Sequence, residues 1–375
     1  MKIETLAVHA GRRNDPATGA VAQPLYLSST YERETDGSYP RGFEYSREGN
    51  PNRAALETCL TALEGGLESL AFSSGLAAIT ACIHAMEPGD HVLASSDVYY
   101  GMRMVSSKVF AKWPVETTYV DMRDLDAVRA AIRPGSTRLI WLETPSNPLL
   151  QVLDLAAIAD IAHEANAICV CDNTFATPVL QRPMEHNVDM VMHSTTKYIN
   201  GHSDVIGGAL VTKNGNYVFE RARIFQQTGG AVPSPFDCWL TMRGIETLPY
   251  RVRGQSANAL ALAKFLSTHP KVEAVHYPGL ESHLSHELAK RQMQGGFGGM
   301  LSVQVKGGKP EAMGVAARTH LFIRATSLGG THSQLEHRAS VEGRNTKTPQ
   351  NLLRVSVGLE HIDDLIADFE QALES

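Results

Sequence analysis

Apolar residues recur along this chain in two patterns, short continuous runs and helical stripes. The continuous runs cover residues 67–72, 91–94, 138–142, 167–171 and 189–192. Helical stripes lie between some of them, over residues 52–63, 76–86 and 155–162. Strands that are apolar along their whole length and alternate with helices predict an α/β fold, with a mostly parallel sheet covered by helices on both faces.

Small and polar residues follow the predicted strands. The clusters are Ser73-Ser74-Gly75, Ser95-Ser96-Asp97, Glu143-Thr144, Asp172-Asn173-Thr174 and His193-Ser194-Thr195-Thr196-Lys197. In sheets of this kind, ligands bind outside the carboxyl ends of the strands. Scattered polar residues would show no preference for one edge, so the pattern predicts a ligand site there.

The pattern is absent from the first 50 residues and changes after Pro235. Residues 1–50 are rich in Gly, Pro, Ser and Arg and show no sustained helical period, which predicts an extended N-terminal arm that needs a partner. After Pro235, a helical stretch precedes strand-like segments at 272–277 and 300–305. We therefore expect an arm over 1–50, an α/β domain over 51–245 and a smaller C-terminal α+β domain over 246–375.

Composition narrows the class of protein. The 375 residues are 43% hydrophobic, enough for a sizeable core, and the net charge of -6 comes from interspersed acidic and basic residues. We therefore expect no nucleic-acid partner. No apolar run approaches about 18 residues and no export signal begins the chain, so we expect no membrane association and a cytoplasmic location.

Cysteine and histidine usage favours neither a disulfide framework nor a metal site. The five cysteines are odd in number and scattered in apolar surroundings, as is typical of reduced core thiols. The 15 histidines include no HExxH pattern and no paired metal spacing. We expect no bound metal.

Lys197 follows an apolar run and lies among hydroxyls, an amide and glycines. Such surroundings suit a buried, chemically active amine and indicate a Schiff-base lysine, although many lysines after strands are simply solvated. Asp172 supports the hypothesis, because a carboxylate after so apolar a strand is costly unless a cation pairs with it. A protonated pyridine nitrogen is such a cation. An aspartate that caps the next helix is the structural alternative.

Other polar residues fit the phosphate of a pyridoxal cofactor. The backbone N–H groups of Gly75 and Leu76 lie at a predicted helix start, where a phosphate is favoured, and the hydroxyls of Ser194 and Thr196 could add donors. Small residues also cap helices for purely structural reasons, so this segment leaves both interpretations open.

Aromatic and amide groups fit the ring of the same cofactor. Tyr99 could stack on the ring face and Asn147 could hydrogen-bond to the ring hydroxyl. Tyr45 and Arg47 in the arm could clamp a phosphate, or be a surface arginine beside a packing tyrosine. Nicotinamide and flavin cofactors require neither the lysine nor the carboxylate, so the joint pattern favours pyridoxal 5'-phosphate (PLP).

Arg354 lies inside an apolar, alternating segment over residues 352–358. A buried arginine needs an anion, and a substrate carboxylate is a good bidentate match. An internal salt bridge is an equal alternative.

These motifs resemble those of the Cys/Met-metabolism family of PLP-dependent enzymes, which includes cystathionine γ-synthase, cystathionine γ- and β-lyases, methionine γ-lyase and O-acylhomoserine sulfhydrylase. The resemblance runs from Thr5 to the end of the chain. Its most specific segments are Tyr45-Ser46-Arg47, Ser74-Gly75-Leu76, Asp97-Val98-Tyr99, Thr196-Lys197-Tyr198, Ser327-Leu328-Gly329-Gly330 and Arg354-Val355-Ser356. It implies a PLP-dependent transferase-like fold of type I, with PLP bound by residues 51–245, and a homotetramer built from two dimers.

The resemblance also implies roles for individual residues. Lys197 and Tyr99 would be catalytic, with Lys197 carrying the cofactor and Tyr99 stacked on its ring, and Asp172 would pair with the ring nitrogen. The substrate carboxylate would bind Arg354, with Ser327 and Asn147 nearby. The implied phosphate contacts include two residues from a neighbouring subunit, and the set is Gly75, Leu76, Ser194, Thr196, Tyr45 and Arg47.

The expected reaction is γ-elimination or γ-replacement on a γ-substituted L-amino acid, as in cystathionine γ-lyase or γ-synthase. Thr326 stands where many such relatives have Glu, and His332 and Arg338 also depart from the family pattern. Methionine, an O-acylhomoserine or canavanine is therefore an alternative substrate. Cystathionine β-lyase, aminotransferase and non-catalytic PLP-binding protein are the alternative functions.

Overall fold

The computed structural model of the chain describes residues 1–342 and 348–374. Within these residues, a seven-stranded sheet has the strand order β1-β7-β6-β5-β4-β2-β3. Its strands are β1 (Glu68–Phe72), β2 (His91–Ser95), β3 (Glu116–Val120), β4 (Thr137–Glu143), β5 (Ile168–Asp172), β6 (Met190–His193) and β7 (Gly208–Thr212). Neighbouring strands pair in parallel along the series β3, β2, β4, β5 and β6, whereas β7 is antiparallel to both of its neighbours, β6 and β1. The predicted mostly parallel sheet is therefore confirmed, although the apolar runs did not reveal β3 and β7.

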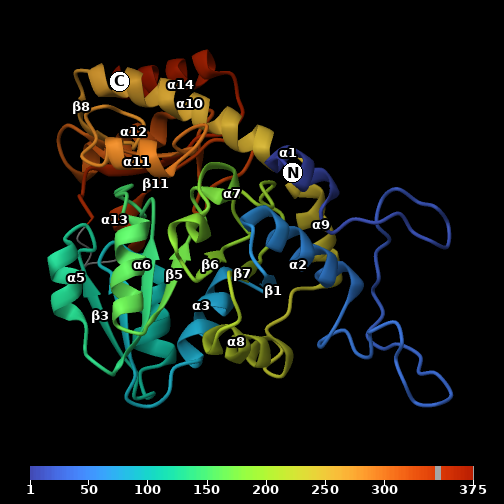
Figure 1. The fold of residues 1–375 in the computed structure, drawn as a ribbon. Helices are drawn as coiled ribbons and strands as arrows, with labels where there is room; N and C mark the ends of the chain where they lie inside the picture. The colour runs from blue at the N-terminus through green and yellow to red at the C-terminus, as the bar shows by residue number, and fades with distance from the viewer. Residues whose placement is uncertain (343–347, 375) are drawn as a thin grey trace.

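Helices cover both faces of this sheet (Figure 1). Alternate residues of β4 point to opposite sides: Trp141 packs with the cluster that contains α3 and α8, and Ile140 packs with the cluster that contains α5 and α6. The covering helices are α2 (Pro51–Glu64), α3 (Gly75–His84), α5 (Leu125–Ala131), α6 (Leu155–Glu164), α8 (Tyr217–Gln227) and α9 (Pro235–Ile245). Burial on both faces explains why the central strands are continuously apolar.

A five-stranded sheet with the order β10-β11-β12-β9-β8 lies above the larger sheet in Figure 1. Its strands are β8 (Val272–His276), β9 (Met300–Val305), β10 (Ile323–Arg324), β11 (Gln334–His337) and β12 (Leu352–Ser356). The helices of this region are α10 (Leu248–Thr268), α11 (His286–Gln292), α12 (Lys309–Arg318), α13 (Arg338–Glu342) and α14 (Ile362–Glu374). Leu301 and Val355 pack with α10, α12 and α14 in a separate core. The domain boundaries near residues 50 and 245 stay a prediction.

The arm is only partly extended. Residues Ile3–His9 form a helix, α1, that packs on α2 and α10 and buries Ala7, so the expectation of an arm without helix is wrong at this point. The remainder extends away from the body in Figure 1. Val21 and Leu27 are 83% and 70% exposed there. Apolar side chains so exposed are typical of a segment that packs on another chain.

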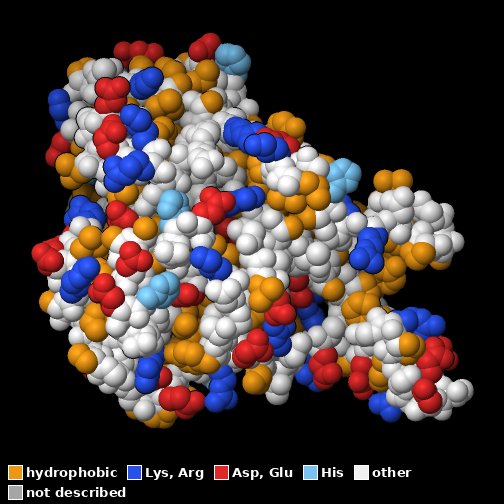
Figure 2. All heavy atoms as spheres, viewed as in Figure 1, with side chains coloured by type: hydrophobic (Ala, Val, Ile, Leu, Met, Phe, Trp, Pro, Cys, Tyr) orange, Lys and Arg blue, Asp and Glu red, His pale blue; other side chains and the backbone are white. Residues whose placement is uncertain are grey.

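Four shorter helices complete the described elements, namely α4 (Tyr100–Met104), η1 (Val105–Val109), α7 (Thr177–Leu180) and η2 (Pro183–His186). None of the helices in the described part of the chain has the length and apolar character to cross a membrane. The described residues also contain no group of three or more His, Cys, Asp or Glu side chains that could hold a metal ion. All five cysteines are buried and unpaired. Basic and acidic side chains are interspersed on the face drawn in Figure 2.

Candidate active site

Four of the predicted site residues come together where the two sheets meet. Lys197, four residues after β6, donates a hydrogen bond of 2.7 Å from Nζ to Ser327 Oγ. Arg354, on β12, donates from Nη2 to the Ser327 carbonyl at 3.0 Å and from Nη1 to Asn147 Oδ1 at 3.2 Å. Ser327 has φ of 82°, a costly conformation for a residue other than glycine. The structure thus places the predicted lysine beside the predicted substrate residues.

Burial changes the acidity of Lys197. Its pKa is lowered to about 8, mainly by desolvation and also by the charge of Arg354, while Glu336 opposes the shift. At neutral pH, Lys197 is therefore deprotonated much more often than a solvated lysine. A neutral amine is the form that attacks a carbonyl carbon or accepts a proton.

Asp172 and Glu143 end the adjacent strands β5 and β4 at paired positions. Both carboxyls are buried, and no described cation forms an ion pair with Asp172. Burial raises both pKa values, and the charge of Asp172 further raises that of Glu143, well above its usual range. Asp172 Oδ1 accepts a hydrogen bond of 3.0 Å from the Thr174 N–H. It does not cap the next helix, α7, whose N-cap residue is Ala176 and which has no side-chain cap, so the structural alternative is wrong. The Asp172 carboxylate can therefore still accept a hydrogen bond from a protonated ring nitrogen.

The start of α3 provides unpaired donors. Ser74 caps the helix by accepting a hydrogen bond from the Ala77 N–H, whereas the N–H groups of Gly75 and Leu76 have no acceptor among the described residues. A side chain at position 75 would place its Cβ 2.9 Å from Ser194 Cβ and 3.1 Å from Ser194 Oγ. Ser194 therefore lies at the helix start, and the group as a whole can accept a phosphate.

Thr196 contributes less to this cradle than the sequence suggests. Its hydroxyl already donates to the Gly207 carbonyl at 3.2 Å and accepts from the Gly207 N–H at 3.0 Å. An interaction between Thr196 and a phosphate would therefore exchange or share these hydrogen bonds.

Tyr99 lies near Leu76 at the start of α3. A Cβ on Gly101 would be 2.3 Å from the Tyr99 ring and 2.8 Å from the Leu76 side chain, which shows that both groups surround that glycine. The Tyr99 N–H donates a 2.7 Å hydrogen bond to Glu143 Oε2, which fixes its backbone. The phenol is also close enough to Arg354 to affect the pKa of the guanidinium. The ring is 37% exposed and so is free to cover a ligand.

Tyr45 and Arg47 are not part of this assembly within one chain. The Arg47 guanidinium lies 5.4 Å from the centre of the Tyr45 ring, bonds to the Gln227 carbonyl and pairs with Glu48. None of these contacts is with the Lys197 cluster. The arm that carries them extends away from the body in Figure 1.

Sequence patterns missed the charges that surround Arg354. Glu336 Oε2 pairs with Arg354 Nη2 at 3.1 Å, and Glu336 Oε1 pairs with Arg338 Nη1 at 2.8 Å. Arg338 Nε also pairs with Glu342 at 2.8 Å. The internal salt bridge considered for Arg354 is therefore present, and burial lowers the pKa of its guanidinium to about 10. The pattern of β11 did not indicate this, because three of its four residues are polar and yet Leu335, Glu336 and His337 are all buried.

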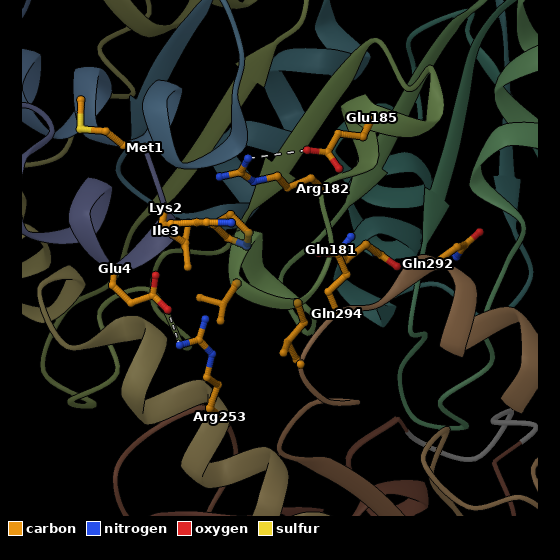
Figure 3. A pocket seen from close by; sticks show the side chains of 14 residues that line it. Met1, Lys2, Ile3, Glu4, Gln181, Arg182, Glu185, Arg253, Gln292 and Gln294 are labelled. Atoms are coloured by element: carbon orange, nitrogen blue, oxygen red, sulfur yellow. Dashed lines mark hydrogen bonds and ion pairs between the residues drawn. The ribbon is translucent and has the colours of Figure 1, made fainter.

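Two of the cavities in the described structure bear on the location of the site. One, of about 340 Å³, is lined by residues that include Asp97, Tyr100, Asn147 and Glu342, so it adjoins the predicted site. The other, of about 500 Å³, lies between α1, α7 and α10 and contains none of the predicted site residues (Figure 3). Arg253 pairs there with Glu4, and Arg182 with Glu185. We assign the chemistry to the region around Lys197 and Asp172, which the smaller cavity adjoins through Asn147.

The residues present fit PLP. An amine of lowered pKa can form a bond to an aldehyde carbon, and an unpaired buried carboxylate can hold a protonated ring nitrogen. Free N–H groups at a helix start can hold a phosphate. Each part of the cofactor thus meets a group of suitable chemistry.

Comparison with known proteins gives the same result. The model of the family described as "Cys/Met metabolism PLP-dependent enzyme" matches residues 4–374. The chain is 52% identical to cystathionine γ-synthase of Mycobacterium tuberculosis, over 98% of this chain and 96% of that one. It is 44% identical to cystathionine γ-lyase of Dictyostelium discoideum, over 100% and 98%. The crystal structure of MetB from Corynebacterium glutamicum superposes with a TM-score of 0.96 at 42% identity, covering 100% of this chain and 98% of that one.

Proposed function

The chain belongs to the family of Cys/Met metabolism PLP-dependent enzymes, and we propose that it replaces the γ-substituent of an activated L-homoserine derivative with a thiol. It is a PLP-dependent enzyme of γ-elimination or γ-replacement, acting on carbon–sulfur or carbon–oxygen bonds. The arrangement of Lys197, Ser327, Arg354 and Asn147 carries the proposal, because it sets a basic amine beside a carboxylate-binding guanidinium.

Lys197 is the base of this proposal. Its neutral amine takes the proton from the substrate Cα, then returns protons to the carbon skeleton as the γ-substituent leaves. Ser327 Oγ, 2.7 Å from Nζ, orients the amine toward the substrate. When bound, PLP supplies the electron sink that stabilises negative charge at Cα, and the Asp172 carboxylate keeps the ring nitrogen protonated.

Arg354 and Tyr99 complete the proposed machinery. The Arg354 guanidinium binds the substrate carboxylate together with Asn147, which exchanges its present hydrogen bond for one to the ligand. Tyr99 covers the cofactor ring and donates its phenolic proton to the leaving group. Gly75, Leu76 and Ser194 hold the phosphate, and Thr196 contributes to it by sharing its hydrogen bonds with Gly207.

We also propose that the protein is a cytoplasmic homotetramer in which Tyr45 and Arg47 reach the phosphate of a neighbouring subunit. The outward direction of the arm and the exposed Val21 and Leu27 support this arrangement. The five buried, unpaired thiols support a reducing compartment.

Mixed oligomers test the role of the arm. Arg47→Ala and Lys197→Ala subunits should each be inactive alone, yet activity should return when the two are refolded together. One site would then combine an intact Lys197 with the other subunit's arginine. Sedimentation of the wild-type protein tests the tetramer. No recovery from a well-mixed oligomer would place Arg47 outside the site.

A second candidate substrate is a γ-substituted amino acid other than an activated homoserine. Thr326 is exposed and uncharged, whereas Arg338 is buried and paired with Glu336. The residues at these two positions therefore differ from those expected in an enzyme that acts on cystathionine. Methionine and canavanine are the alternatives to compare. Aminotransfer would be recognised by a dependence on added 2-oxo acid.

A substrate screen tests the proposed reaction. O-succinyl- and O-acetylhomoserine, cystathionine, methionine and canavanine are each incubated with the PLP-loaded protein, with and without cysteine. We expect cystathionine to form from an acylated homoserine and cysteine, and ammonia with a 2-oxo acid to form without cysteine. Turnover of another member of the series alone would overturn the replacement proposal while keeping the reaction class.

A further inference from the structure

A buried pair of polar side chains lies beneath the site, and the reaction proposed above does not use it. His193 Nε2 lies 2.5 Å from Glu64 Oε1, and the two side chains are 0% and 1% exposed. The same Glu64 oxygen accepts a hydrogen bond of 3.0 Å from Asn173 Nδ2. Glu64 ends α2, His193 ends β6 and Asn173 follows β5. The pair therefore joins one helix to two central strands.

Gln181, directly after α7, extends this network to a third strand. Its Nε2 donates to Asn173 Oδ1 and to the Thr144 carbonyl, both at 3.0 Å. Asn173 Nδ2 donates to the Gln181 carbonyl at 2.9 Å in return. Because Thr144 follows β4, the carboxyl ends of β4, β5 and β6 are connected by one set of buried hydrogen bonds.

Each connected strand end carries a residue of the proposed machinery. Asp172 directly precedes Asn173, and Ser194 directly follows His193. Asn147 lies three residues after Thr144. A shift at any of these ends would therefore move a group that contacts the cofactor or the substrate.

The two members of the pair face different groups. Burial raises the pKa of Asp172, the hydrogen bonds with Thr174 oppose that rise, and a positive charge on the His193 ring would oppose it further. The Glu64 carboxylate instead adds to the burial that raises the pKa of the Cys171 thiol. His193 is thus the member that favours the ionised form of Asp172.

Stability alone does not explain this pair. Glu64 Oε2 and His193 Nδ1 are buried without a hydrogen-bond partner among the described residues, so their desolvation is only partly offset. Apolar side chains of similar volume often stabilise a core at least as well as a buried ion pair. The placement of the pair under three site residues points to function.

We propose that Glu64 and His193 are positioning residues for the reaction: they hold the ends of β5 and β6 so that the Asp172 carboxylate faces the ring nitrogen of the cofactor. The inference rests on the proposed function. Loss of the pair lowers kcat and changes the absorbance of the bound cofactor. KM changes little, because the substrate carboxylate binds elsewhere, at Arg354.

A double-mutant cycle tests the proposal on the PLP-loaded protein. For Glu64→Gln, which keeps the size of the side chain and removes its charge, we expect kcat to fall about tenfold and KM to stay within about twofold. In an Asp172→Asn background, the same substitution should leave the wavelength of the absorbance maximum unchanged. It should change kcat by less than about twofold, because no carboxylate remains to be positioned. The absorbance maximum reports on every variant that holds cofactor, even where turnover is too slow to measure.

His91→Asn is the matched control for His193→Asn. His91 is also buried and bonds through its ring to the hydroxyls of Thr137 and Thr118, at 2.8 Å and 2.9 Å, but it lies at the opposite, amino end of β2. We expect His91→Asn to lower only the thermal midpoint, and His193→Asn to change the cofactor absorbance and kcat as well. Identical behaviour of the two variants, or additive effects of Glu64→Gln and Asp172→Asn, overturns the inference. A wild-type protein without cofactor absorbance or turnover would instead overturn the proposed function.

Discussion

The two halves of the site satisfy their polar groups in opposite ways. In the half that belongs to the larger sheet, Asp172 has no cation and the N–H groups of Gly75 and Leu76 have no acceptor among the described residues. In the half that belongs to the smaller sheet, Arg354 and Arg338 already share Glu336. The first half presents polar groups that can pair with a ligand, whereas the charges of the second half already pair with one another.

This difference bears on how each ligand binds. A cofactor that enters the first half meets unpaired groups at Asp172 and at the start of α3, and competes there with the hydrogen bonds of Thr196 and Lys197. A substrate carboxylate that approaches Arg354 must compete with Glu336, so binding there is an exchange of partners. We therefore expect substitutions in the first half to affect cofactor and catalysis, and substitutions in the second to affect folding as well.

Lys197→Ala should produce the largest effect. Loss of the base and of the cofactor bond is expected to reduce kcat/KM at least about 1000-fold. The thermal midpoint of the cofactor-free protein should stay equal or rise, since burial disfavours the charged amine. Activity assays and absorbance spectra with and without PLP measure both. Lysine-bound cofactor absorbance that persists in the variant would contradict the assignment.

Glu336→Gln should instead act on folding and lower the free energy of unfolding by about 3 kcal/mol. The substitution leaves two buried guanidinium groups without their shared anion. Urea unfolding of the cofactor-free protein is the measurement. Glu287→Gln, which removes a pair with Lys290 at the surface, is the control and should change nothing measurable. Equal midpoints for the two variants would mean that the charges of the second half are not coupled to folding.

The pH dependence of cofactor capture should be smaller, roughly tenfold between pH 7 and pH 9. The neutral Lys197 amine is the reactive form, and its pKa is lowered to about 8, so the rate rises with pH and levels off above that value. Stopped-flow absorbance after mixing cofactor-free protein with PLP gives the profile. A midpoint near about 10.4, the value of a solvated lysine, would show that Lys197 is not desolvated.

Gly75→Ala should have the smallest effect, a PLP affinity about fivefold weaker. The added Cβ would lie 2.9 Å from Ser194 Cβ and 3.1 Å from the Met192 Cε atom, so the helix start must shift. Gly215→Ala has open space around its Cβ and is the control. Equilibrium titration with PLP compares the two. A weaker affinity in both variants would remove the α3 start from the phosphate site.

Much of the first half of the site was predictable, because its residues lie at the ends of apolar strands. Lys197, Asp172 and the Gly75 segment follow such runs, and the parallel sheet brings strand ends together. Glu143 also follows an apolar run, but its residue type and position indicated no role. Only the pairing of β4 with β5 sets its carboxyl beside Asp172.

The second half was less predictable, because its contacts join distant segments. Arg354 was expected to bind an anion, and the sequence left open whether that anion is internal. Glu336 reaches it through the antiparallel pairing of β11 with β12, where the two residues are in register. The Glu64–His193 pair was also missed, because a helix end and a strand end 129 positions apart meet only after folding.

The sequence by itself determined the fold class and the cofactor and indicated Lys197 as the candidate amine, because these depend on strand periodicity and on residue types at strand ends. The tertiary structure decided the charge balance of the site. Acidity and pairing depend on burial and on distances between chain segments, and neither is set by local sequence. Lys197 was therefore recognisable as a lysine of unusual surroundings, whereas its lowered pKa and its place beside Ser327 and Arg354 followed only from the packing of the two sheets.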